Sequence, residues 1–147
     1  MLLDIPGFIA ELKSHAVEHG FHIHDERHFI ETYTMRQAFE IDLHPESACG
    51  GPVDLQLSLD LEPRTLMSFE DEIIMLSDDA YPSEDLTLDL LFTWQLPPLA
   101  HGPDLLVLAT ELAGISGTEL PTQVSAMDSF TDVTDQAERS LGVTSRL

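Results

Sequence analysis

The sequence predicts an α+β fold: an antiparallel sheet of three to five strands, covered on one face by N-terminal and C-terminal helices. Segments 39–43 and 53–61 alternate apolar with polar or acidic residues, which is typical of strands buried on one face. Helical spacing of apolar residues is clearest near the two ends of the chain. Because composition shows no break over 147 residues, we expect a single domain spanning residues 1–147.

The first predicted element is a helix over 5–19, because apolar residues recur there at steps of three and four. Asp4 can cap its first turn, and Gly20 suits the position just after its last turn. We expect a short strand at 21–25 and a second one near 29–35.

The next elements are the two alternating strands, 39–43 and 53–61. The Gly- and Pro-rich connector between them predicts an antiparallel hairpin with a long loop. A short helical turn is expected at 68–76, and a further strand at 86–96. The residues predicted to be buried in this sheet are Val53, Leu55, Leu57, Leu59, Leu90, Phe92 and Trp94.

The last third of the chain changes to helical spacing. A helix is predicted from Asp104 to the glycines at 114 and 117. A second, amphipathic helix is predicted over 120–141, because Leu120, Val124, Met127 and Phe130 fall at steps of three and four. Residues 142–147 are then expected to be a tail.

Charge is the most informative property of the composition. The chain has 27 acidic and 6 basic residues, a formal net charge of -21, and no Lys or Arg between Arg64 and Arg139. Such a chain repels nucleic acid and anionic membrane surfaces and attracts basic proteins. Solubility alone, as in the acidic proteomes of salt-tolerant bacteria, is the alternative explanation. Without a positively charged leader or a long apolar run, and with Cys49 as the only cysteine, we expect a cytoplasmic location.

No dinucleotide fingerprint, P-loop or HExxH motif is present, and Cys49 with His44 lacks a third group that would orient the imidazole. The preferred hypothesis is therefore a non-enzymatic module that binds a basic partner protein through its polar sheet face. In size, acidity and element order the chain resembles small acidic secretion chaperones, immunity proteins and antitoxins, and its sheet face also suits a homodimer. The residues predicted to bind the partner are Glu40, Asp42, Asp54, Asp60, Glu62 and Asp89.

Residues 14–28 contain most of the histidines of the chain. His15 and His19 share a helix face, and His22 and His24 share a strand face, so together they could ligate zinc or a similar metal. A histidine-rich helix end without any cofactor explains the same residues and is preferred. A proton-sensitive element and a small-ligand carrier with an apolar pocket near Trp94 are further alternatives.

Overall fold

The computed structural model describes residues 4–77, 79–86, 88–99, 101–102, 104–131 and 137–147. Within these residues the chain forms helices on a six-stranded antiparallel sheet of order β1-β2-β3-β4-β6-β5. The elements in chain order are α1 (Ile5–Glu18), β1 (Phe21–Ile30), β2 (Gln37–Pro45), the 3₁₀ turn η1 (Glu46–Ala48), β3 (Asp54–Leu61), α2 (Pro63–Met75), β4 (Leu90–Leu99), α3 (Leu105–Ser116), β5 (Thr122–Ser129) and β6 (Glu138–Arg146).

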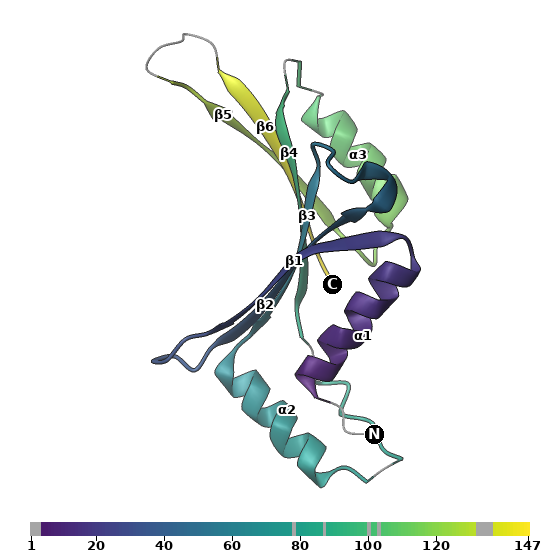
Figure 1. The fold of residues 1–147 in the computed structure, drawn as a ribbon, viewed down its shortest axis with the longest axis vertical. Coiled ribbons are helices and arrows are strands. Elements are labelled where there is room, and N and C mark those ends of the chain that lie inside the picture. The colour runs from purple at the N-terminus through teal and green to yellow at the C-terminus, as the bar shows by residue number, and fades with distance from the viewer. Residues whose placement is uncertain (1–3, 78, 87, 100, 103, 132–136) are drawn as a thin grey trace.

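The sheet has a helix-covered face and an open face. Figure 1 shows α1, α2 and α3 on one side of the sheet, while the tips of the β1–β2 and β5–β6 hairpins extend away from the helices. Alternation along β3 places Leu55, Leu57 and Leu59 in the core and leaves Asp54 and Asp60 exposed on the other side.

The core lies between the sheet and its helices. Leu59 and Leu61 are each only 1% exposed, and they pack with residues from α1, α2 and the neighbouring strands. Among the residues that the structure describes, the buried apolar ones are Ile5, Ile9, Ile41, Leu43, Leu55, Leu57, Leu59, Leu61, Leu66, Leu90, Leu141 and Val143.

Helix α1 begins at Ile5, as its sequence predicts, and ends at Glu18, one residue before the predicted end. The Asp4 carboxylate accepts a hydrogen bond from the Gly7 backbone N–H at 2.6 Å, which satisfies one free donor of the first turn. Gly20 follows the last turn with a φ of 83°, a conformation that glycine adopts without steric cost. Ile5 and Ile9 are the helix residues that enter the core.

The α+β class and the antiparallel hairpin are confirmed. Strands β2 and β3 pair in the register Phe39–Leu59, Ile41–Leu57 and Leu43–Leu55, so their apolar residues lie on the same face. The prediction of three to five strands is wrong, because the sheet contains six.

The additional strands come from the region predicted to be a C-terminal helix. Residues 122–129 and 138–146 instead form the hairpin β5–β6, and positions 132–136 of the predicted helix lie outside the described residues. The steps of three and four were coincidental: Val124 pairs with the buried Val143, whereas Met127 and Phe130 are exposed. The predicted tail at 142–147 is largely strand β6, which lies between β4 and β5.

Other boundaries also differ from the predictions. Residues 21–30 form one strand, and the chain turns over 31–36 where a second strand was expected. Strand β4 starts at Leu90 and continues past the prolines expected to stop it, which fall where its pairing with β6 is irregular. Val53 precedes β3 and is 40% exposed, although it was predicted to be buried.

Two of the predicted core residues, Phe92 and Trp94, are only partly buried. Among the helices of the described residues, none has the length and apolarity that crossing a bilayer requires.

Candidate functional site

An apolar groove lies between α1 and the helix-covered face of the sheet. It encloses about 410 Å³. Strands β3 and β4 contribute Leu55, Phe92 and Trp94, α1 contributes Ala16, and the α3–β5 connection contributes Leu120. We call this cavity the Trp94 groove.

The Trp94 groove exposes aromatic side chains that a closed core would cover. The rings of Phe92 and Trp94 stack with their centroids 5.9 Å apart, and both residues are half-buried. Lys13 also lines the groove, but its ammonium group is paired with Glu26 at 2.6 Å. The groove therefore offers apolar contact area without a free lysine charge.

Helix α3 is a second apolar surface on the same side of the sheet. Its 12 residues carry one charge, Glu111, yet none of them is buried. Leu106 is 75% exposed and Ile115 is 83% exposed. A helix that is apolar on most sides is usually covered, so this surface is suited to contact with another molecule.

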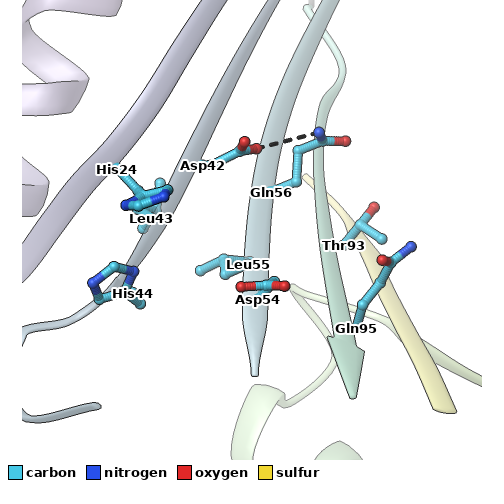
Figure 2. Close-up of a pocket in the computed structure, with 9 residues that line it drawn as sticks. All are labelled: His24, Asp42, Leu43, His44, Asp54, Leu55, Gln56, Thr93 and Gln95. Carbon is cyan, nitrogen blue, oxygen red and sulfur yellow. Dashed lines mark hydrogen bonds between the residues drawn. The ribbon is translucent and has the colours of Figure 1, made fainter. Parts of the chain in front are cut away.

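The open face contains a polar hollow of about 350 Å³, shown in Figure 2. His24 and His44 lie side by side at one edge, and Gln56 and Gln95 project from β3 and β4. The dashed line marks the hydrogen bond that Gln56 donates to Asp42 at 3.3 Å.

Most carboxylates predicted to bind a basic partner are already paired with arginines of the chain. Arg27 donates to Asp42 through both terminal nitrogens at 2.8 Å and to Glu40 at 3.1 Å. Arg36 makes a bidentate pair with Asp60, and Arg146 lies 3.7 Å from Asp89. In the described part of the chain, no ion pair involves the two remaining predicted residues, Asp54 and Glu62.

These pairs stabilise the ionised carboxylates. The hydrogen bonds from Arg27 hold the pKa of Asp42 below its ordinary value, and Arg36 lowers the pKa of Asp60 in the same way. A carboxyl group whose folded-state pKa is lowered stabilises the fold above its unfolded pKa of about 3.9. That stabilisation is lost as the pH falls through the folded-state value.

Arg27 also pairs with Asp25 at 2.7 Å. Replacing Arg27 by Met should therefore lower the midpoint of urea unfolding at pH 7, because Asp25, Glu40 and Asp42 would repel one another. The difference from wild type should shrink below a pH of about 3.9, where the carboxylates become protonated. Urea titrations at several pH values measure this. Arg64→Met is the matched control, since no ion pair in the described residues involves Arg64. Equal effects at pH 7 and at the acid end of the titration series would contradict the prediction.

The four histidines predicted as metal ligands lie on two different faces. His15 of α1 and His19, the residue that caps the C-terminal end of α1, have ring centroids 4.1 Å apart, and both line the Trp94 groove. His22 is on β1, where it alternates with Phe21 and Ile23 of the helix-covered face. His24 lines the hollow of the open face, and its ring centroid is 5.7 Å from that of His44.

Two residues that were not among the predicted ligands, His44 and Cys49, lie beside His22. His44 Nε2 lies 3.3 Å from His22 Nδ1 and 3.1 Å from Cys49 Sγ, and Cys49 Sγ lies 3.7 Å from His22 Nδ1. Among the described residues, these three form the group whose metal-ligating atoms converge. The short spacing of His44 and Cys49 was visible in the sequence, whereas the approach of His22 depends on the β1–β2 register.

The chain was compared with protein families, with curated proteins and with solved structures, and no match was found in any of them.

Proposed function

We propose that the protein is a non-enzymatic binding module that holds an amphipathic, basic helix of a partner protein in the Trp94 groove. The observation that carries this proposal is the open groove itself, with the half-buried Phe92 and Trp94 as its floor. Apolar grooves of this kind bind amphipathic helices through anchors spaced at i, i+3, i+4 and i+7.

Charge favours a basic partner over a second copy of the chain. Two copies would each carry -21, so their fields oppose close approach, whereas a cationic segment is attracted. Exposed carboxylates occur on α1 and beside Leu120 in the α3–β5 connection, namely Glu11, Glu18 and Glu119. Lysines flanking an apolar anchor can therefore meet carboxylates outside the groove.

The open face is the less favoured surface for the same partner. Glu40, Asp42 and Asp60 already have arginine partners. A basic protein would therefore have to displace these arginines or share the carboxylates with them. Asp54 and Glu62 are the remaining predicted contacts on that side. The exposed apolar residues of α3 extend the apolar area on the helix-covered side, which also supports the groove as the main surface.

Trp94 is the only tryptophan of the chain, so its emission reports directly on the groove. We expect a synthetic helical peptide with Leu at i, i+3, i+4 and i+7 and Lys elsewhere to shift Trp94 emission to shorter wavelength. Binding should weaken as salt rises past about 0.15 M, where the screening length is about 8 Å. A peptide of the same composition without helical spacing, and a peptide with Glu replacing Lys, are the controls.

If the Lys peptide binds but Trp94 emission stays unchanged, the peptide contacts another surface. That result would contradict the proposal that the Trp94 groove is the binding surface. Equal binding of the Glu peptide would contradict the role of charge. Self-association of the protein without peptide, detected by sedimentation, would favour a second copy as the occupant.

A further inference from the structure

We propose that His22, His44 and Cys49 form a binding site for a zinc ion. The proposal is independent of the function above, because these residues lie apart from those that line the Trp94 groove. It rests on two histidines from paired strands and one cysteine from the connector between β2 and β3.

The distances among the three ligand atoms match the edges of a tetrahedral zinc site. With Zn–N of about 2.05 Å and Zn–S of about 2.3 Å, tetrahedral angles give N–N edges of about 3.4 Å and N–S edges of about 3.6 Å. The corresponding distances here are 3.3 Å between the nitrogens, and 3.1 and 3.7 Å from the nitrogens to the sulfur. A single ion can therefore contact all three atoms once His44 Nε2 and Cys49 Sγ move apart by about half an ångström.

The backbone brings these side chains together from separate elements. His22 and His44 are direct partners in the antiparallel pairing of β1 with β2. The turn η1 then reverses the chain so that Cys49 faces His44, and the Glu46 backbone N–H donates to the Gly20 carbonyl oxygen at 2.9 Å. This hydrogen bond ties the connector to the turn that precedes His22.

Hydrogen bonds can satisfy at most two of the three contacts among these atoms at one time, because each ring nitrogen offers either one proton or one lone pair. His22 and Cys49 both approach the same nitrogen of His44, Nε2, which carries at most one proton. That proton can be directed well at only one of the two neighbours. A cation at the centre is attracted by all three lone pairs at once.

The contact between His22 and Nε2 of His44 argues against a role for Cys49 as a nucleophile. In a catalytic triad, the orienting group bonds the imidazole nitrogen that faces away from the nucleophile. Here His22 contacts the nitrogen that faces the thiol, so it does not orient His44 as a general base. Convergence on one point is instead what metal ligands require.

The donor set selects the metal. Two imidazole nitrogens and one thiolate suit zinc, while magnesium and calcium prefer oxygen ligands. His22 and Cys49 are exposed, so the fourth position is open to solvent. Three protein ligands and one open position is the composition of zinc sites that exchange a ligand.

The test uses the full chain, prepared without a polyhistidine tag, stripped of metal and kept reduced. Titration with Co²⁺ should saturate at one equivalent and produce the sulfur-to-cobalt charge-transfer band and the strong visible bands of tetrahedral cobalt. One equivalent of Zn²⁺ should then abolish the spectrum. Cys49→Ser should remove the charge-transfer band, and His44→Gln should weaken Co²⁺ binding by at least about 100-fold.

His15→Gln is the matched control, because His15 lies on α1 outside the cluster. Its Co²⁺ affinity should stay within about threefold of wild type. Circular dichroism checks that each variant is folded, and Cys49 is in an exposed connector where Ser should be tolerated. A weak octahedral cobalt spectrum without the charge-transfer band would overturn the proposal. Equal loss of affinity in His15→Gln and His44→Gln would also overturn it.

Discussion

Val143→Asp should destabilise the domain by more than about 4 kcal/mol, which is most of the stability of a typical domain of this size. Val143 is 6% exposed at the centre of β6, with β4 on one side and β5 on the other. A carboxylate there would be removed from water without a partner. Urea unfolding followed by circular dichroism measures the loss.

Thr144→Asp is the matched control for this prediction. Thr144 is the next residue along β6 and pairs with Thr93 and Gln123, so its side chain lies on the open face. The same substitution should cost no more than about 1 kcal/mol there. If residues 142–147 were a tail, the two variants would behave alike, which is the outcome that contradicts the six-stranded sheet.

Leu59→Ala should lower the free energy of unfolding by roughly 2–5 kcal/mol. Leu59 is 1% exposed and pairs with Phe39 of β2 and Leu90 of β4, so truncation leaves a cavity in the middle of the core. Leu106→Ala, the same change at a site 75% exposed on α3, should alter stability by less than about 0.5 kcal/mol. Equal costs at the two sites would contradict the assignment of the core.

Strand periodicity could be predicted from the sequence where one face is buried and the other is charged. In 39–43 and 53–61 each apolar residue alternates with a polar one, and the period of two is unambiguous. In 122–129 the outward-facing positions include Met127, so apolar residues on both faces resemble helical spacing. The pairing of β5 with β6 determines that residues 122–129 form a strand, and the local sequence pattern carries no signal of this pairing.

The candidate sites were predictable to different degrees. The sequence alone indicates His22 as a candidate metal ligand and Trp94 as the position of a candidate pocket. It pairs His44 with Cys49 only as a nucleophile, because the position of His22 opposite His44 follows from strand register. Likewise, Arg27 forms ion pairs with Glu40 and Asp42 only because β1 pairs with β2, since these residues are distant along the chain.

If the Trp94 groove binds the partner helix, a side chain that fills the groove should block binding. Ala16 lines the groove, whereas Ala10 is an exposed residue of the same helix that does not. We expect Ala16→Phe to fold and to weaken binding of the Leu/Lys peptide at least tenfold, because the phenyl ring occupies the space of the peptide's anchors. Ala10→Phe should bind the peptide as wild type does. Equal affinity of the two folded variants would contradict binding in the Trp94 groove.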